Sequence, residues 1–354
     1  MPHNIVTFYH IGHKVPDDLY TKKVSIVYVV TGGAGFIGSN LVAALDQEGM
    51  APVAVIDRID NPHKKKNIAK HPIGYLIEPE DTFSFLEKHQ TKIKVLFHLG
   101  AISSTVSRDL KRLKAVNVDL GCSLWHWCTR NRVPFIFASS AAIYGDGSWG
   151  FDDDCASSTL SKFRPLNAYG CSKQQFDCFV AGTAESGAGT PPQWAGLRFF
   201  NVYGPNEFHK GYQASVASHI YPVAARGEPF ALFRSHHSAY SDGGQMRDFV
   251  YVSDCIDVML WLLQDGKTSG FFNVGTGKAR TFLDLASAVY SALNLSPMIT
   301  FKDTPVDIRD QYQYFTKANL QRLRKAGYDR PFRSLETGIH EYVCRYLSQP
   351  DPYS

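Results

Sequence analysis

The sequence lacks a hydrophobic run long enough to cross a membrane. A spanning helix needs about 20 apolar residues, whereas apolar runs such as VSIVYVV at residues 24–30 are far shorter. The first 23 residues also lack the long apolar stretch of a secretory signal, and they carry Asp17 and Asp18. We interpret residues 1–23 as an N-terminal extension without a function of its own, and we predict no membrane partner.

A strong excess of one charge and paired cysteines are also missing. The chain has 37 basic and 33 acidic side chains, a net charge of +4, which is too small an excess to indicate a nucleic-acid partner. Its seven cysteines are scattered, odd in number and form no CxxC pair. A reducing compartment explains this usage most simply. We therefore predict a cytoplasmic protein that binds neither nucleic acid nor a metal ion.

A glycine-rich turn between a strand and a helix is the strongest pattern present. The β-branched run at 24–30 is typical of a strand buried on both faces. Gly33, Gly35 and Gly38 then have the GxGxxG spacing, and a second strand ends at Asp57, at about the 20-residue distance of dinucleotide-binding units. Such glycines let the backbone approach a pyrophosphate at a helix N-terminus. The pattern predicts a bound dinucleotide, with a ligand-free turn as the alternative.

The residues around Asp57 bear on which dinucleotide is bound. Asp57 alone favours NAD, because a carboxylate repels a 2′-phosphate. Arg58 follows directly, and lysines occupy positions 64–66. A charge run of this kind is usually a solvated loop, but beside the ribose these cations would neutralise a 2′-phosphate. We predict NADP as the cofactor, with NAD as the alternative.

Further strands follow at the spacing of a doubly wound α/β fold. The segments 94–101 and 133–145 are apolar runs that end in small or polar residues, and ligands of such sheets bind beyond the carboxyl ends of the strands. We predict a parallel Rossmann sheet over 24–203, to whose edge the segment 247–277 returns. A smaller substrate-binding domain would consist of 204–246 and 278–354.

The stretch NAYGCSK places Tyr169 four residues before Lys173 at the start of a predicted helix. Residues at this spacing are neighbours, which surface packing alone would explain. The catalytic explanation is that a cation beside a phenol lowers the pKa of the tyrosine. Ser140, at the end of a strand, would hold a substrate oxygen nearby. Oxidation of an alcohol needs a general base, and this set would supply it.

Five motifs resemble those of the extended short-chain dehydrogenase/reductase family, which includes the sugar-nucleotide epimerases. They are TGGAGFIG, SSAAIYG, YGCSK, RFFNVYGP and RDFVYVSD, and the resemblance covers residues 24–345. It implies that Ser140, Tyr169 and Lys173 are catalytic and that Lys173 also contacts the nicotinamide ribose. Alanines follow Ser140 where the family's dehydratases have an Asp-Glu pair, so dehydration is disfavoured.

The glycine turn and this resemblance together predict the residues that bind the cofactor. Asn117, in AVNVDLG, matches a family position near the cofactor. The full predicted set is Gly32, Gly35, Phe36, Ile37, Gly38, Asp57, Arg58, Lys64, Leu99, Gly100, Ala101, Asn117, Lys173 and Val202.

The segment 198–220 resembles more narrowly the ADP-glyceromanno-heptose 6-epimerases, in which a lysine in an HKG context is a second acid/base. Here that residue is Lys210. Inverting a carbon through a ketone returns hydride to the opposite face, so a second group can handle the proton. The alternative is a loop lysine in contact with cofactor or phosphate. The resemblance implies epimerisation of ADP-heptose at C6 for the lipopolysaccharide core, by a homo-oligomer that is a pentamer.

The same resemblance implies the residues that would contact the nucleotide sugar. They are Asn201, His219, Phe233, Arg234, Ser235, His236, Arg247 and Tyr312. The chain departs from the family pattern at Tyr212, where a small hydroxyl residue is usual, and at Arg234 and Ser235, where an acid and a glycine are common. Two alternatives stay open: another sugar-nucleotide epimerase, such as a UDP-hexose 4-epimerase, or a nucleotide-sensing protein without catalysis. The intact catalytic set argues against the latter.

Overall fold

A seven-stranded parallel sheet forms the centre of the molecule. The computed structural model describes residues 26–154, 156–309 and 312–354, so the predicted extension at 1–23 lies outside the described residues. The strand order is β10-β6-β5-β4-β1-β2-β3, and every neighbouring pair is parallel. This confirms the predicted doubly wound α/β class. The strands are β1 (Val27–Thr31), β2 (Val53–Ile56), β3 (Tyr75–Ile77), β4 (Ile93–His98), β5 (Phe135–Ser140), β6 (Trp194–Phe199) and β10 (Gly270–Val274).

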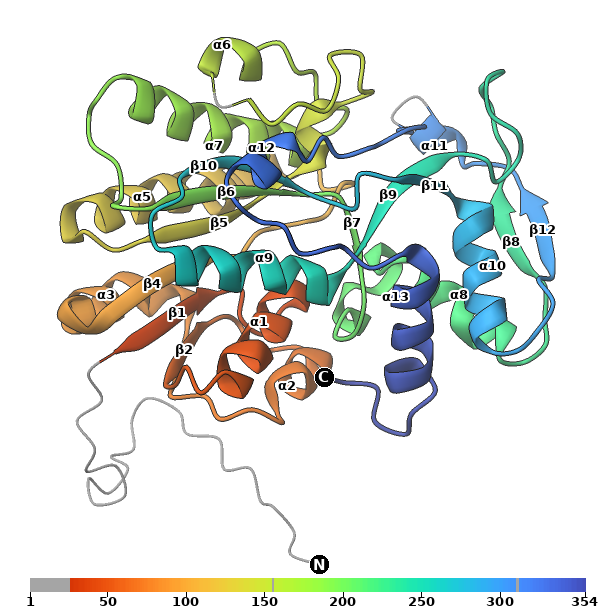
Figure 1. Cartoon of the computed structure of the whole chain (residues 1–354), viewed down its shortest axis with the longest axis horizontal. Helices are drawn as coiled ribbons and strands as arrows, with labels where there is room; N and C mark the ends of the chain where they lie inside the picture. The colour runs from red at the N-terminus through yellow and green to blue at the C-terminus, as the bar shows by residue number, and fades with distance from the viewer. Residues whose placement is uncertain (1–25, 155, 310–311) are drawn as a thin grey trace, which may run out of the picture.

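Helices cover both faces of this sheet (Figure 1). On one face α1 (Phe36–Gln47) packs against α9 (Val252–Asp265), and their apolar side chains share a buried core with alternate strand residues. On the other face α5 (Leu120–Asn131) and α7 (Ala168–Glu185) form a second core. Strands buried on both faces need side chains that are apolar throughout, which the β-branched runs provide.

Shorter helices connect the strands or lie at the rim. They are α2 (Pro62–Ile68), α3 (Thr82–His89), α4 (Leu110–Leu113), α6 (Ser157–Leu160), α11 (Val306–Arg309) and α12 (Gln321–Lys325). Asn61 caps α2, since its side chain accepts a hydrogen bond from the His63 N–H. This places the lysines of α2 just beyond the end of β2.

A second, smaller part lies beside the carboxyl ends of the strands and has its own apolar core (Figure 1). The segments HIYPVAARG and FLDLASAVYSALN contain most of the helices α8 and α10. Within the segment 247–277, β10 lies at the edge of the large sheet, whereas β9 pairs with β7 and β11. The domain boundaries stay a prediction. This part contains β7 (Asn201–Tyr203), β8 (Phe230–Phe233), β9 (Met246–Tyr251), β11 (Ala279–Thr281), β12 (Ile299–Lys302), α8 (Val216–Ala224), α10 (Phe282–Ala292) and α13 (Leu335–Tyr342).

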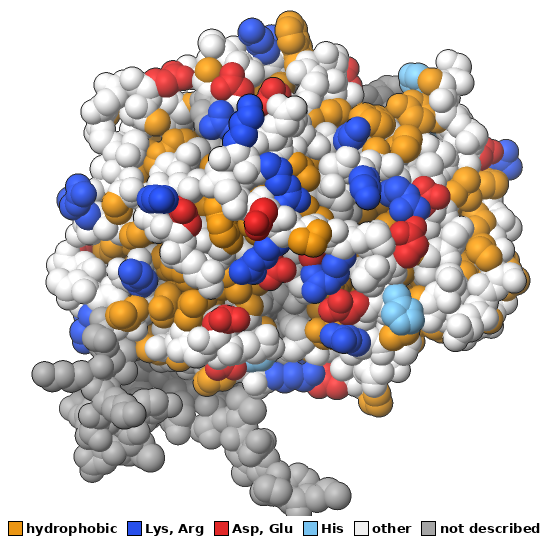
Figure 2. All heavy atoms as spheres, in the orientation of Figure 1, with side chains coloured by type: hydrophobic (Ala, Val, Ile, Leu, Met, Phe, Trp, Pro, Cys, Tyr) orange, Lys and Arg blue, Asp and Glu red, His pale blue; other side chains and the backbone are white. Residues whose placement is uncertain are grey.

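The surface is mixed in charge on the face shown in Figure 2, where basic and acidic side chains are interspersed. Within the described ranges, none of the helices combines the length and the apolar character that crossing a membrane requires. The six cysteines of the described part of the chain are all free thiols, in line with the absence of a disulfide framework in the sequence.

Candidate active site

Most of the predicted site residues surround one cavity of about 1320 Å³. It lies where the carboxyl ends of β1, β4, β5 and β6 meet the smaller part of the molecule. Five predicted residues are not in its wall, namely Arg58, Asn117, Arg234, Ser235 and His236. The predicted residues in its wall are Gly32, Gly35, Phe36, Ile37, Gly38, Asp57, Lys64, Leu99, Gly100, Ala101, Ser140, Tyr169, Lys173, Asn201, Val202, Lys210, His219, Phe233, Arg247 and Tyr312.

The glycine turn packs so closely against its own backbone and that of Gly100 that neither Gly32 nor Gly38 could carry a side chain. Gly32 has a φ of +67°, and a Cβ on it would lie 2.6 Å from the Gly100 backbone. A Cβ on Gly38 would lie 2.1 Å from the Gly32 carbonyl oxygen. The helix α1 begins directly after this turn, at Phe36. Because Gly32, Gly35 and Gly38 lie in the cavity wall without side chains, the turn fits a dinucleotide, whose pyrophosphate would rest on the backbone at the helix N-terminus.

Asp57 is tied to both the glycine turn and α2. Its Oδ2 accepts a hydrogen bond from the Ala34 N–H at 3.0 Å, and its Oδ1 accepts one from the Lys64 ammonium at 2.8 Å. The pair is largely buried, so Lys64 offsets the carboxylate's charge at the predicted ribose end of the cavity. Arg58 is turned away and pairs with Glu80, which explains its absence from the wall.

Asn117 acts on the cavity through a neighbouring loop. Its buried carboxamide accepts a hydrogen bond from the Ile102 N–H at 2.8 Å and donates to the Ile102 carbonyl at 3.0 Å. It also donates to the Ser172 hydroxyl at 2.9 Å. These bonds fix the loop after β4 against α7, beside Lys173. In this structure Asn117 thus positions the wall of the cavity and is not itself part of it.

Ser140, Tyr169 and Lys173 meet where β5 ends and α7 begins. Asn167 caps α7 by accepting a hydrogen bond from the Gly170 N–H at 2.9 Å, which brings Tyr169 into the first turn. The hydroxyl of Ser140 lies near the Tyr169 phenol, and it accepts a hydrogen bond from the Ala142 N–H at 3.2 Å. Lys173 is only 4% exposed, and its ammonium donates to the Ala138 carbonyl at 2.8 Å.

The pKa of Tyr169 does not move in the direction that the sequence suggests. Burial raises it, and the nearby Ser140 hydroxyl only partly opposes that rise. The predicted lowering by Lys173 is wrong for this arrangement, because the ammonium is directed at the Ala138 carbonyl and burial is the larger effect. Burial also lowers the pKa of Lys173 to about 8, while Asp177 acts in the opposite direction.

A buried ion pair behind Lys173 was not predicted from the sequence. Asp177 lies one turn further along α7, and its Oδ2 accepts hydrogen bonds from the Ser139 hydroxyl at 2.9 Å and the Arg198 Nε at 3.1 Å. The pair is completely buried. It links β5, β6 and α7 beneath the catalytic set. The only signal for it in the sequence is an acid four residues after the lysine.

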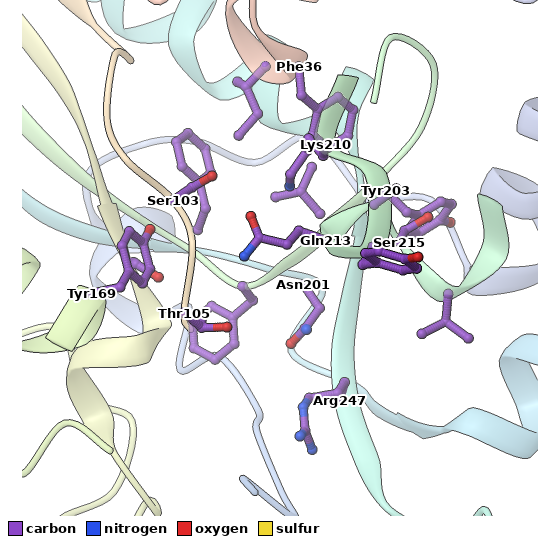
Figure 3. Close-up of a pocket in the computed structure, with 18 of the residues that line it drawn as sticks. Phe36, Ser103, Thr105, Tyr169, Asn201, Tyr203, Lys210, Gln213, Ser215 and Arg247 are labelled. Carbon is purple, nitrogen blue, oxygen red and sulfur yellow. The ribbon is translucent and has the colours of Figure 1, made fainter. Parts of the chain in front are cut away.

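Lys210 enters the cavity from the 3₁₀ helix η6 (Phe208–Gln213), on the side opposite Tyr169 in the view of Figure 3. Its ammonium lies 5.3 Å from the centre of the Phe36 ring. Burial lowers the pKa of Lys210, and Glu207 opposes this shift. Glu207 is buried and accepts hydrogen bonds from the hydroxyls of Ser215 at 2.6 Å and Tyr342 at 3.0 Å. Glu207, which the sequence did not single out, thereby anchors the segment that carries Lys210.

Arg247 is a buried cation at the other end of the cavity (Figure 3). It is 7% exposed, and its guanidinium lies 5.6 Å from the Phe282 ring centre and 5.4 Å from that of Tyr312. Arg247 forms no ion pair with the described residues. The adjacent carboxylate, Asp248, instead accepts hydrogen bonds from the backbone of residues 276, 277 and 318. A buried guanidinium without a carboxylate suits a diphosphate, which its planar fork can bind.

The predicted run from Phe233 to His236 reaches the cavity only through Phe233. Arg234 is exposed and lies 3.6 Å from Asp242 and 3.8 Å from Asp303. The backbone N–H of Ser235 also donates to Asp242, and that of His236 donates to the Tyr314 hydroxyl. These bonds hold residues 234–236 to the neighbouring loops and outside the wall.

The remaining polar residues of the cavity wall include one predicted residue, His219, and several that the sequence analysis did not name. His219, which was predicted, has a buried Nε2 without a hydrogen-bond partner in the described part of the chain. No group of three or more His, Cys, Asp or Glu in that part is arranged to hold a metal ion. The unpredicted polar residues of the wall are Ser103, Thr105, Ser139, Tyr203, His209, Tyr212, Gln213, Ser215, Gln245 and Lys302.

Comparison with known proteins identifies relatives that share the sequence and the fold of this chain. Residues 28–275 match the model of the NAD dependent epimerase/dehydratase family. An ADP-L-glycero-D-manno-heptose-6-epimerase of Nitratidesulfovibrio vulgaris (strain DP4) is 44% identical over 331 residues, which cover 92% of this chain and 100% of the relative. The crystal structure of the enzyme of that name from Helicobacter pylori is 27% identical, with a TM-score of 0.74 and coverage of 92% and 98%.

A Thermus thermophilus UDP-glucose 4-epimerase in complex with NAD is a further structural neighbour, with 26% identity, a TM-score of 0.71 and coverage of 90% and 98%. It shares the architecture of the sheet and the smaller part. The family match spans most of this chain and includes the glycine turn, Ser140, Tyr169 and Lys173. The chain belongs to the NAD dependent epimerase/dehydratase family.

Proposed function

We propose that the protein epimerises ADP-D-glycero-D-manno-heptose at C6 to ADP-L-glycero-D-manno-heptose, by transient oxidation and re-reduction on the opposite face, for lipopolysaccharide core synthesis. The observation that carries this proposal is the presence of Tyr169 and Lys210 on opposite sides of one cavity (Figure 3). A relative 44% identical to this chain bears the corresponding name, which supports the choice of substrate.

Each residue of the site has a part in this reaction. A nicotinamide cofactor bound at the glycine turn supplies the hydride acceptor and, later, the hydride donor. Ser140 holds the sugar oxygen that Tyr169 deprotonates or reprotonates, and both side chains lie in the wall of the same cavity. Lys210 does the same for the oxygen of the other epimer. Arg247 binds the diphosphate and so fixes the end of the substrate that does not react.

A UDP-hexose 4-epimerase is the alternative, and it needs only the tyrosine. Incubation with ADP-D-glycero-D-manno-heptose, followed by NMR of the epimer ratio, separates the two functions. We expect the ratio to move to equilibrium, with UDP-galactose left unchanged. Turnover of UDP-galactose without any change of the heptose would contradict the proposal.

We also propose that NADP is the preferred cofactor. The Lys64–Asp57 pair supports this, since the lysine offsets the carboxylate that would otherwise repel a 2′-phosphate. Arg58 contributes less to binding a 2′-phosphate than its position after Asp57 suggests, because its guanidinium pairs with Glu80. The homo-oligomer of five subunits and the cytoplasmic location also stay predictions.

Replacing Lys64 with Ala should reduce the preference for NADP. A hydrogen bond to a charged group contributes about 1.5–3 kcal/mol, so we expect NADP affinity to fall roughly 10-fold or more while NAD affinity changes little. The measurement is the dissociation constant of each dinucleotide for the stripped protein. The exposed Lys92→Ala variant is the matched control. A wild-type preference for NAD, or an unchanged ratio in Lys64→Ala, would refute the choice of NADP.

A further inference from the structure

We propose that Gln213 binds the sugar of the substrate between the two acid/base residues and thereby determines specificity for the hydroxylated sugar over the nucleotide alone. This inference rests on the proposed function and assigns the sugar subsite within it. Gln213 is the last residue of η6, three positions after Lys210, and it lies in the wall of the cavity.

The position of the Gln213 side chain is the first argument. In Figure 3 its carboxamide extends into the cavity, with Tyr169 on one side and Lys210 on the other. A substrate carbon that exchanges protons with both residues must lie in this space. The carboxamide is therefore directed at the part of the ligand that reacts, whereas Arg247 lies at the distant end (Figure 3).

The second argument is that the carboxamide has no other use in the described part of the protein. The side chain is partly buried, yet none of its polar atoms is hydrogen-bonded to another described residue. Its amide atoms are open to the cavity and are not among the buried polar atoms that lack a partner, so they are available to bind a ligand. Its neighbour Tyr212 is fully exposed to solvent, so it does not compete for this place.

The chemistry of the amide fits a sugar with neighbouring hydroxyls and a transient ketone. The Nε2 group donates two hydrogen bonds and the Oε1 atom accepts two, so one residue can bind both a hydroxyl and a carbonyl oxygen. It carries no charge, so it would not change the protonation of Lys210 three residues away. A neutral donor and acceptor can also keep its bonds when the ketone presents its other face.

Gln213→Leu, which preserves size and removes the hydrogen bonds, tests this proposal. For the holoenzyme we expect the KM for ADP-D-glycero-D-manno-heptose to rise at least 10-fold, while the inhibition constant of ADP stays within twofold of the wild-type value. Gln213→Asn, whose amide is one methylene shorter, should recover part of the loss. The matched control is Gln47→Leu, since Gln47 is exposed at the end of α1 and outside the cavity wall.

Each outcome decides the proposal. An unchanged KM in Gln213→Leu overturns it, and so does an equal weakening of ADP, which would mean a general disturbance of the site. Should Gln213→Leu fail to fold, the Gln213→Asn variant gives the same comparison of sugar nucleotide with ADP. If the wild-type protein leaves the heptose unchanged, the proposed function fails first and this inference fails with it. Wild-type turnover with an indifferent Gln213 overturns this inference alone.

Discussion

Replacing Tyr169 with Phe is expected to lower the rate of epimerisation about 1,000-fold, within the range that positioned acid–base groups contribute. The substitution removes only the hydroxyl, which lies near Ser140 at the end of β5. Without it, the substrate alcohol loses the proton acceptor that the proposed mechanism assigns to this side of the cavity. Burial raises the pKa of Tyr169. Once the phenol is ionised, this raised pKa makes it a strong base.

The measurement is the rate of change of the epimer ratio, and the bound cofactor is the control. Phe has the same ring, so the cofactor content of the purified variant should equal that of the wild type. Tyr75→Phe is the matched substitution, because Tyr75 lies in β3 among apolar neighbours and outside the cavity wall. A Tyr169→Phe variant that retains more than about a tenth of the activity would remove Tyr169 from its role.

Local patterns in the sequence predicted the frame of the site well. The glycine turn, Asp57 and the Tyr169–Lys173 spacing each depend on a few consecutive residues whose backbone geometry is set by the strand and helix that hold them. Ser140 was predicted as a site residue from its position at the end of a strand, because the carboxyl ends of parallel strands meet at one edge of the sheet. For such residues the distance along the chain determines the distance in space.

Contacts between distant segments were beyond this kind of prediction. Arg58 was expected at the cofactor, but Glu80, 22 residues away, takes its guanidinium. The pKa of Tyr169 was expected to fall, but burial raises it, and burial depends on how segments distant in the sequence pack together. Glu207 was overlooked because its partner Tyr342 lies 135 residues away. Such contacts between residues far apart in the sequence cannot be predicted from a short motif.

Replacing Lys210 with Met is expected to be nearly as damaging as the change at Tyr169, with a loss of at least about 100-fold. The substitution keeps the length and apolar stem of the side chain and removes the ammonium, which lies over the Phe36 ring. Lys88→Met, an exposed change on α3, is the matched control. Epimerisation in both directions passes through both residues, so the loss should be the same from either epimer.

The charge partner of Lys210 gives this prediction a pH dependence. Burial lowers the pKa of Lys210, and the carboxylate of Glu207 raises it again. Glu207→Gln removes the raising effect, so the pKa of Lys210 should fall further. The limb of the pH–rate profile on which Lys210 loses its proton should therefore move to lower pH. A variant that loses activity equally at every pH would indicate that Glu207 only maintains the fold of η6.

The two variants together distinguish two acid/base residues from one. If Tyr169 and Lys210 each serve one epimer, Lys210→Met should still oxidise the epimer that Tyr169 serves, and Tyr169→Phe should still oxidise the other. Absorbance of the reduced nicotinamide after mixing with each pure epimer measures this directly. With a single base, Tyr169→Phe would oxidise neither epimer and Lys210→Met would oxidise both. That second pattern would make Lys210 a contact of the phosphate or cofactor, and the position of its ammonium opposite Tyr169 would then have no part in the proton transfer.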